Sequence, residues 1–316
     1  MSNSTSIYSL SISGRLTLEM HSLNNEGGEG NQTMTRTVAL VDTAGQVHKV
    51  NAVSGDMFKH IQAEHFYYLA REGGLPLCKG CQTFRSDRIL GDDDFLKNLP
   101  KTDEETLTAL AKTCALDEIE GTLIAKGSRS IPRKSIAEFA WVVGVPDNVR
   151  TESYFHVRYA QERGGDDKAS QPIFHRPASS GIYASVATFE LARIGFNDIS
   201  QKYALSEEER LLRYQTFLKS VLYTYIEPSG AMRGTQNPHI LNFEGVVTVS
   251  HGVLPAPTIS PLALDYKEQI EAISQALDHN GSLLKVHAFK DMAGFATIMK
   301  PIIDGTRPYR LFNNGG

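Results

Sequence analysis

Four side chains within the first 114 residues have the types and spacing that bind a metal ion. Cys78 and Cys81 form a Cys-x-x-Cys pair, Cys114 follows at the end of a helix-like segment, and His65 precedes the pair. Three thiolates and one imidazole make a closed tetrahedral set, so we expect a structural zinc with no catalytic role. His60 is the less favoured fourth ligand because it lies on another helix face. Three reduced thiols and a core histidine are the alternative interpretation.

The stretch NAVSGDMFKH, residues 51–60, could bind an anion. It runs from a strand-like segment through Ser54 and Gly55 into a helix that carries Lys59 near its start. The free backbone N–H groups of a helix start bind phosphate, a glycine lets the backbone come close, and a lysine adds charge. The same residues fit an ordinary helix start, in which Ser54 or Asp56 is the cap. Both interpretations stay open on this segment alone.

A short basic stretch offers a second candidate for phosphate contacts. Residues 126–134, KGSRSIPRK, contain four basic side chains and no acidic one, whereas residues 91–120 contain nine acidic and three basic ones. Gly, Ser and Pro interrupt the basic stretch, which favours a loop, and loops that mix Arg with Ser commonly contact phosphate. A solvated basic loop is the alternative. The net charge is −4, so composition alone indicates no nucleic-acid-binding protein.

Catalytic motifs of the common enzyme classes are missing from the sequence. It contains no Gly-x-Ser-x-Gly elbow, no Walker loop and no Gly-x-Gly-x-x-Gly fingerprint after a strand. Asp92, Asp93 and Asp94 could hold a hard cation, but adjacent acids in a loop are more typical of a solvated surface. We therefore expect no catalytic residues and no catalytic cofactor.

Length and composition are those of an ordinary globular protein. The chain has 316 residues, of which 41% are hydrophobic and 22% charged, enough for one large domain or two. No apolar run is long enough to cross a bilayer, and the start, MSNSTSIYSL, lacks the pattern of a secretion signal. We expect a cytoplasmic protein with reduced cysteines and no membrane partner.

The segments that would position these residues alternate between strand and helix patterns. Residues 10–20 alternate apolar and polar side chains, as in a half-buried strand, and a second strand is expected at residues 34–42. A helix follows to about residue 71, and residues 75–102 read as an irregular insertion. Capping boxes predict helix starts at three places, Thr102–Glu105, Ser135–Glu138 and Ser206–Glu209.

The second half of the chain adds a long arm and the remaining strands. Residues 147–180 are polar, with strand-like arms on both sides of GGDD, which indicates a protruding hairpin. Strands are expected at residues 181–195, 245–253 and 282–289, and helices at about 206–226 and 265–279. This order indicates an α+β fold, most simply an antiparallel sheet with helices on one face. A ferredoxin-like or RNA-recognition-motif-like core is the natural candidate.

Six segments in a shared order resemble a known family. They are GNQTMTRTVALVD, VNAVSGDMFKHIQAEHF, LCKGC, CALDEIEGTL, QPIFHRPASSGIYASVATFELARIG and GAMRGTQNPHI. In these segments the chain resembles the DevR-type backbone subunit of type I CRISPR Cascade, a branch of the repeat-associated RNA-binding superfamily. The similarity runs from about residue 10 to residue 250, so it covers most of the chain.

The resemblance implies a single hand-shaped domain that binds RNA and catalyses nothing. The palm sheet would comprise residues 1–58, 181–255 and 262–316, the finger insertion residues 59–146, and the thumb hairpin residues 147–180. Copies would stack head to tail along a CRISPR RNA in an I-B-like complex. Each thumb would push one base out at a regular interval and reach the next copy, and the other bases would stay available to pair with target DNA.

The resemblance also assigns roles to individual residues. The implied contacts with the RNA backbone come from the helix start at Ser54, Gly55 and Lys59, the polar strand entry at Asn31, Gln32, Thr33 and Arg36, the basic loop at Arg129, Arg133 and Lys134, and a palm loop at Arg233, Thr235 and Asn237. Phe174 and His175 would lie near the displaced base. Because the net charge is negative, these residues would form one concentrated basic stripe.

Partners and alternative functions follow from the same resemblance. The implied partners are the CRISPR RNA, further copies of the chain, target DNA and the repeat-processing, PAM-recognising and small subunits of Cascade. A related subunit that cuts guide-paired RNA would need an acid beside the displaced base, and Asp42 and Asp56 are the nearest candidates. A transcriptional autoregulator would need a helix-turn-helix with a basic recognition helix, and the sequence shows no such pattern.

Overall fold

The structure is a computed structural model that describes residues 5–157, 173–229 and 237–312. Its strands are β1 (Ser6–Ile7), β2 (Ser9–His21), β3 (Asn25–Glu29), β4 (Gln32–Thr35), β5 (Thr37–Val41), β6 (Val47–Val53), β7 (Thr122–Lys126), β8 (Arg129–Arg133), β9 (Ala137–Phe139), β10 (Val142–Val157), β11 (Ile173–Phe189), β12 (Phe196–Asn197), β13 (Lys202–Tyr203), β14 (His239–Ser250), β15 (Leu284–Phe289) and β16 (Arg307–Pro308). Its α-helices are α1 (Gly55–Glu72), α2 (Asp93–Lys97), α3 (Asp103–Thr113), α4 (Ala115–Glu120), α5 (Glu207–Ile226), α6 (Tyr266–Leu277) and α7 (Met292–Gly305). Short 3-10 helices are η1 (Cys81–Thr83), η2 (Arg88–Gly91) and η3 (Leu191–Arg193).

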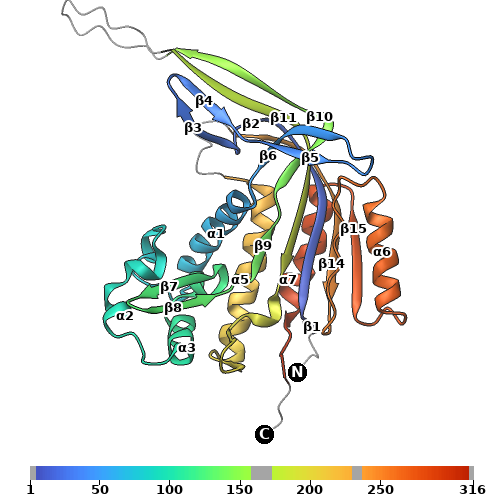
Figure 1. Ribbon diagram of the computed structural model, residues 1–316. Coiled ribbons are helices and arrows are strands. Elements are labelled where there is room, and N and C mark those ends of the chain that lie inside the picture. The colour runs from blue at the N-terminus through green and yellow to red at the C-terminus, as the bar shows by residue number, and fades with distance from the viewer. Residues whose placement is uncertain (1–4, 158–172, 230–236, 313–316) are drawn as a thin grey trace, which may run out of the picture.

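One large sheet organises these elements. Its strand order is β15-β14-β2-β11-β10-β6-β5, with every neighbouring pair antiparallel, and β9 pairs with the end of β11. In Figure 1, β10 and β11 extend beyond the other strands as a long hairpin. Residues 75–133, which include η1, η2, α2, α3, α4 and the β7–β8 hairpin, form a lobe beside the sheet and are here called the lobe. The expected combination of an antiparallel sheet with helices is confirmed.

Strand β2 lies in the interior of the sheet, between β14 and β11, and its alternating sequence predicts a half-buried strand. The apolar side chains that it buries in the main core with α1, α5 and α7 are Leu10, Ile12, Leu16 and Leu18. The polar face is covered as well. Ser11 donates a hydrogen bond to the carbonyl of Pro257 (3.2 Å), and Arg15 donates to that of Pro261 (2.9 Å). This polar face therefore packs against residues 257–263 and is not free for a ligand.

Two glycines make room for an aromatic cluster on the core face of the sheet. Gly14 and Gly245 lie opposite each other in β2 and β14, and a Cβ on Gly14 would lie 2.7 Å from the ring of Phe243. Phe243 stacks on Tyr225 of α5 with ring centroids 4.5 Å apart, and Phe295 of α7 meets Phe243 edge-on at 5.0 Å. Such stacked and edge-to-face contacts fix α5 and α7 to the centre of the sheet.

Helix α6 covers the opposite face of the sheet. Val246 of β14 packs with Tyr266 and Ile270 of α6, whereas its neighbour Val247 belongs to the main core. Because successive strand residues point to opposite faces, helices lie on both sides of the sheet. The expectation of helices on one face alone is wrong.

A buried carboxylate joins the lobe to the rest of the fold. Glu118 of α4 accepts hydrogen bonds from Arg133 Nη2 of β8 (2.6 Å), from the backbone N–H of Gly195 (3.0 Å) and from Arg213 Nη1 of α5 (3.4 Å). The side chains of all three charged residues are at most 3% exposed. Removing one partner of such a buried charge group typically costs about 3–5 kcal/mol, because the charge that remains is left uncompensated.

The start of α1 packs directly on the backbone of β9. Ser54 caps the helix, since its Oγ accepts a hydrogen bond from the backbone N–H of Met57 (3.2 Å). Gly55 is buried, and a Cβ at this position would lie 2.1 Å from the carbonyl oxygen of Phe139. A side chain of any size therefore cannot fit between α1 and β9 as they are packed.

Two sequence expectations differ from the structure, and one helix was not expected. Residues 135–138 do not begin a helix, because Ser135 Oγ accepts from the backbone N–H of Ala137 and the segment pairs with β11 as β9. The basic stretch 126–134 is not a loop, since residues 129–133 form β8 of a hairpin. Helix α7 was not expected, because Gly294 and Pro301 interrupt its sequence pattern.

None of the helices in the described ranges combines the length and apolar character needed to cross a membrane.

Protonation of His21 should control the acid stability of the fold. His21 is buried beside Tyr183 (ring centroids 4.9 Å apart), and neither ring nitrogen has a hydrogen-bond partner among the described residues. Burial lowers the pKa of its imidazole to about 4. Between pH 6.5 and pH 4 the imidazole of His21 is therefore protonated in the unfolded chain and neutral in the folded chain. The free energy of unfolding should fall by about 1.4 kcal/mol per pH unit until pH reaches the folded pKa.

Urea unfolding between pH 7.5 and pH 4 checks this expectation. Wild type should lose stability on acidification relative to His21→Phe, which retains the ring contact and cannot titrate. His279→Phe, at an exposed histidine, should keep the wild-type pH dependence. Parallel pH profiles for wild type and His21→Phe would contradict the assignment.

The close packing at Gly55 predicts a strong effect of one methyl group. Gly55→Ala should destabilise the protein by about 1–3 kcal/mol, as overpacking does, because α1 must move away from β9. Gly305→Ala at the end of α7 is the matched control, since a Cβ there meets nothing within 4 Å. Chemical denaturation of both variants should show a loss for the first and no loss for the second. Equal stabilities would mean that α1 and β9 do not pack as described.

Candidate nucleic-acid interface

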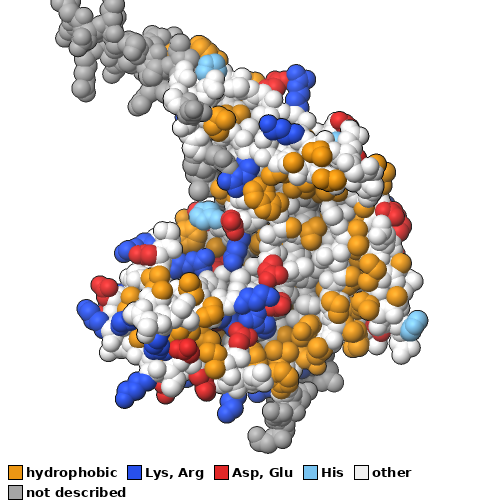
Figure 2. Space-filling view, in the orientation of Figure 1, with side chains coloured by type: hydrophobic (Ala, Val, Ile, Leu, Met, Phe, Trp, Pro, Cys, Tyr) orange, Lys and Arg blue, Asp and Glu red, His pale blue; other side chains and the backbone are white. Residues whose placement is uncertain are grey.

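A pocket of about 350 Å³ lies between the start of α1 and the lobe. Its lining residues are Asp56, Lys59, His60 and Ala63 of α1, Phe84, Arg85, Ser86 and Arg88 around η1 and η2, and Leu116 of α4. Figure 2 shows basic side chains, with acidic ones among them, along the hollow between the lobe and the sheet. Four of the nine lining residues are Lys, Arg or His, so the pocket is suited to an anion.

The geometry of α4 holds two of these basic side chains in place. Lys59 Nζ donates a hydrogen bond to the carbonyl of Glu120, and Arg88 Nη1 donates to that of Gly121, each at 2.9 Å. Both carbonyls lie at the C-terminal end of α4, where the helix dipole favours cations. Burial lowers the pKa of the Lys59 amine and raises that of the Glu120 carboxyl to about 7.

Arg85 is the more accessible cation of the pocket. Its side chain is 58% exposed and forms an ion pair with Asp87. An exposed ion pair of this kind is weak, so the guanidinium can exchange Asp87 for a bound anion at little cost. Sequence patterns gave no signal for Arg85 or Arg88, because long-range packing of the insertion against α1 brings them to Lys59.

The structure corrects the expected roles of Gly55 and Arg133. Gly55 is buried against Phe139, so this glycine serves helix packing and does not let the backbone approach a ligand. Arg133 is 5% exposed and bound to Glu118, so it cannot reach RNA. Ser54 is the helix cap, as its ordinary interpretation predicts.

Arg129 and Lys134, the other two expected contact residues of the basic stretch, lie beside acidic side chains. Arg129 donates to Asp103 Oδ1 (2.7 Å) and to the carbonyl of Pro100 (2.6 Å). Lys134 lies between Glu138 (3.1 Å) and Glu190 (3.4 Å) and is about half exposed. The stretch therefore contains ion pairs and does not form an unopposed basic stripe.

The polar strand entry and the hairpin come together, although they lie more than 140 residues apart in sequence. The backbone N–H of His175 donates to the carbonyl of Asn31 (2.9 Å), and His175 pairs in parallel with Gln32. The ring of His175 meets that of Phe155 edge-on, with centroids 5.9 Å apart, and Phe155 is 60% exposed. Asn31, Gln32, Phe155 and His175 thus form one cluster, here called the hairpin cluster. Phe155 was missed in the sequence, where only its place in a strand-like arm was visible.

A second exposed aromatic lies beside the same strands. The Arg36 guanidinium lies over the ring of Trp141 at 5.2 Å, and Trp141 is 44% exposed. Thr33 is half-buried in β4. Trp141 is the one tryptophan of the chain. Apart from this rarity, no sequence pattern marks it as an exposed residue beside Arg36.

Several expected contact residues cannot be placed. Arg233 and Thr235 lie outside the described residues, as does the side chain of Phe174, whose backbone pairs with His156 in the β10–β11 hairpin. Asn237 is described and exposed.

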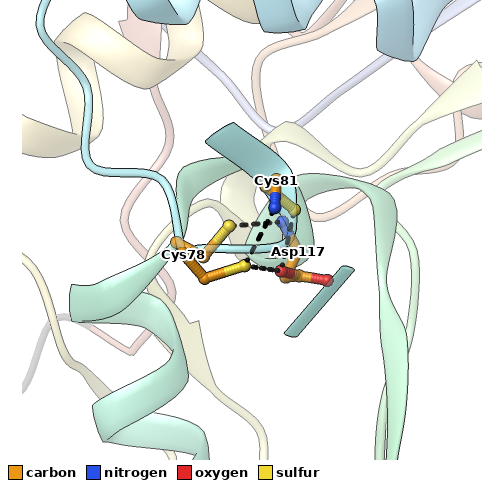
Figure 3. Close-up of side chains that lie close together, drawn as sticks. Cys78, Cys81 and Asp117 are labelled. Atoms are coloured by element: carbon orange, nitrogen blue, oxygen red, sulfur yellow. Dashed lines mark hydrogen bonds between the residues drawn. The ribbon is translucent and has the colours of Figure 1, made fainter. Parts of the chain in front are cut away.

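The three cysteines meet in the lobe, but His65 is not their partner. Cys78, Cys81, Cys114 and Asp117 have ligand atoms that all lie within 4.8 Å of one another, and all four residues are buried. Figure 3 shows Cys78, Cys81 and Asp117 pointing toward one another. His65 instead bonds to the carbonyl of Glu227 at 2.9 Å. The predicted Cys₃His set is therefore wrong in its fourth member, and the Cys₃Asp group could bind a metal.

Known proteins resemble this chain over most of its length. The sequence matches the family described as CRISPR-associated negative auto-regulator DevR/Csa2 over residues 12–271. A CRISPR-associated protein Cas7/Cst2/DevR from Methanocaldococcus jannaschii is 24% identical over 267 residues, which cover 78% of this chain and 82% of that protein.

Two solved chains resemble the fold at 12% sequence identity. One, from a CRISPR RNA-guided surveillance complex, has a TM-score of 0.48 over 93% of this chain and 98% of that chain. The other, from such a complex described as pre-nicking, has a TM-score of 0.47 over 96% of both chains. The match over residues 12–271 covers far more than half of the sequence. The chain therefore belongs to the DevR/Csa2 family of CRISPR-associated proteins, as its sequence resemblance predicts.

Proposed function

We propose that this protein is a non-catalytic backbone subunit of a type I, I-B-like CRISPR Cascade that binds the sugar-phosphate backbone of the CRISPR RNA. The observation that carries the proposal is the pocket in which α1 and the insertion bring Lys59, Arg85 and Arg88 around one hollow. Membership of a CRISPR-associated family supports it. So does the relative from Methanocaldococcus jannaschii, which is described as a CRISPR-associated protein Cas7/Cst2/DevR.

The chemistry of the pocket fits a guide of any sequence. A scaffold for varied guides must contact phosphate and ribose and leave base edges free for pairing. Lysine and arginine donors meet that need when they contact phosphate, because the charge of a phosphate is the same beside every base. A pocket with three strong cations and one acid, Asp56, attracts phosphate without selecting a base.

The hairpin cluster would contact the base that is pushed out of the stack. We assign the parts of β10 and β11 that lie within residues 147–180 to the thumb, residues 59–146 to the fingers, and the rest of the large sheet to an RNA-recognition-like palm. An aromatic side chain beside an unstacked base adds sequence-tolerant stacking of about 1–3 kcal/mol. Phe155 is exposed and supported by His175, which suits it to this contact.

Repeated binding along one RNA would need head-to-tail contacts between copies. A heterologous interface of this kind does not close on itself, so it generates a helical filament whose length the RNA sets. The long β10–β11 hairpin is the element that could reach a neighbouring copy (Figure 1). The partners would be the RNA, further copies, the other Cascade subunits and target DNA, in the prokaryotic cytoplasm.

The alternative functions have less support. Asp42, an acid considered for RNA cleavage, accepts hydrogen bonds from the backbone N–H groups of Ala44 and Gln46 and pairs with His48, which is the role of a turn residue between β5 and β6. Asp56 lines the pocket next to Lys59, and the described residues of the lining include no second acid with which it could hold a catalytic metal. The family description names an auto-regulator, but the sequence shows no helix-turn-helix pattern with a basic recognition helix.

Removing two pocket cations should weaken RNA binding without changing its sequence preference. Lys59→Ala with Arg85→Ala should lower the affinity for several unrelated RNAs equally. The slope of log K against log salt should fall by about 0.7 for each lost phosphate contact on a single strand. Fluorescence anisotropy over a salt series measures both quantities. Lys112→Ala with Lys300→Ala, at exposed lysines outside the pocket, is the charge-matched control. The same affinity and slope as wild type in the pocket variant would refute the assignment.

Removing the exposed ring of the hairpin cluster should cost stacking energy. Phe155→Ala should weaken RNA binding by about 1–3 kcal/mol, or about 5- to 150-fold, whereas Phe155→Tyr should bind like wild type because it retains a ring. Val41→Ala removes an exposed apolar side chain from β5 and should have no effect. The same titrations, run with RNAs of unrelated sequence, decide between these outcomes. An effect confined to one sequence would speak against a sequence-independent role.

A further inference from the structure

We propose that Cys78, Cys81, Cys114 and Asp117 bind one structural Zn²⁺ ion. Nothing in this assignment depends on RNA binding, because it rests on the geometry of four buried side chains in the lobe. Figure 3 labels three of them, Cys78, Cys81 and Asp117.

The four side chains form two loops of the same kind. Cys78 and Cys81 are three residues apart, and so are Cys114 and Asp117. In each loop the sulfur of the first residue accepts a hydrogen bond from the backbone N–H of the last, at 3.4 Å to Cys78 Sγ and 3.5 Å to Cys114 Sγ. Zinc ligands commonly come in pairs with two residues between them, which is the spacing of both loops. N–H donors to sulfur stabilise the thiolate that zinc requires. Asp117 therefore takes the position in the second loop that Cys81 takes in the first.

The distances between the ligand atoms suit a tetrahedral ion. Asp117 Oδ2 lies 3.3 Å from Cys78 Sγ and 3.2 Å from Cys81 Sγ. With Zn–S of about 2.3 Å and Zn–O of about 2.1 Å, a regular tetrahedron places its sulfur and oxygen ligands about 3.6 Å apart. The group therefore needs to expand by only a few tenths of an ångström at these edges.

One carboxylate oxygen of Asp117 has no hydrogen-bond partner among the described residues, and a bound cation would compensate its charge. This oxygen, Oδ1, is buried. A buried acceptor without a partner is costly, and a carboxylate more so. A divalent ion at the centre of the group would compensate the thiolates and the carboxylate together. Three sulfurs and one oxygen select zinc over Mg²⁺ or Ca²⁺, which prefer oxygen ligands alone.

The position of the group indicates what the ion would stabilise. The first loop leads into η1 and η2, with Arg85 between these two helices and Arg88 at the start of η2. The second loop is the start of α4, whose end binds Lys59. The backbone N–H of Ala115 also donates to the carbonyl of Pro76 (2.8 Å), so the two segments already touch. A closed four-ligand site between them would fix both walls of the pocket and would activate no water.

Metal analysis of the full-length protein tests the assignment. The chain would be expressed with zinc in the medium, dialysed against a weak chelator without RNA, and analysed by inductively coupled plasma mass spectrometry. We expect about one zinc per chain, and X-ray absorption should show three sulfur neighbours and one oxygen neighbour. Because no RNA is present, this result is independent of the proposed function.

Variants distinguish Asp117 from His65 as the fourth ligand. Loss of an outer-shell partner alone weakens metal binding about 10- to 100-fold, so Asp117→Ala, which removes a direct ligand, should weaken it by at least as much. Asp117→Cys should keep one zinc and change the absorption spectrum to four sulfur neighbours. His65→Ala is the control and should keep the wild-type zinc content and spectrum.

Two results would overturn the assignment. One is wild-type protein that contains no zinc after dialysis, with either three free thiols or a Cys78–Cys81 disulfide by mass spectrometry. The other is zinc that His65→Ala removes and Asp117→Ala retains. If Asp117→Ala does not fold, the wild-type zinc content and its neighbour count still decide.

Discussion

The buried carboxylate of Glu118 is the interaction on which the arrangement of the lobe and the sheet depends. It bonds at once to β8, to α5 and to the backbone of Gly195, so segments from three parts of the chain share one charge group. A buried carboxylate keeps a stable position only if donors surround it, which makes the geometry of its partners specific. Because Glu118 belongs to α4, which also lines the pocket through Leu116, these bonds help to fix the position of the lobe relative to α1.

Helix α4 links the three features that carry function, although it has six residues. Asp117 belongs to the Cys₃Asp group, Glu118 to the ionic network, and the carbonyls of Glu120 and Gly121 hold Lys59 and Arg88. All six residues of α4 are buried. The Cys₃Asp group, the charge network and the pocket are thus connected through one short helix, and a change at any one should alter the geometry of the others.

Local signals in the sequence were reliable where nothing competed with them. The capping boxes at Thr102 and Ser206 begin α3 and α5, but the same pattern at Ser135 yields to pairing with β11. The Cys-x-x-Cys pair was visible, whereas Asp117 was not, because its approach depends on how the insertion folds onto α4. Arg133 has the sequence pattern of a surface cation, but it is buried against Glu118, to which no sequence pattern connects it. Family resemblance led to the proposed function, whereas the pocket became visible only in the packing of η1 and η2 against α1.

The central claim is that the pocket around Lys59 and Arg85 holds the phosphate backbone of an RNA whose base edges stay free. Electron cryomicroscopy of the protein assembled on RNA tests it most directly. We expect a phosphate oxygen within about 2.7–3.2 Å of a donor in this pocket, and the same contact in every copy along the strand. An RNA that passes elsewhere and leaves the pocket without phosphate, or that is held by its base edges, would contradict the account.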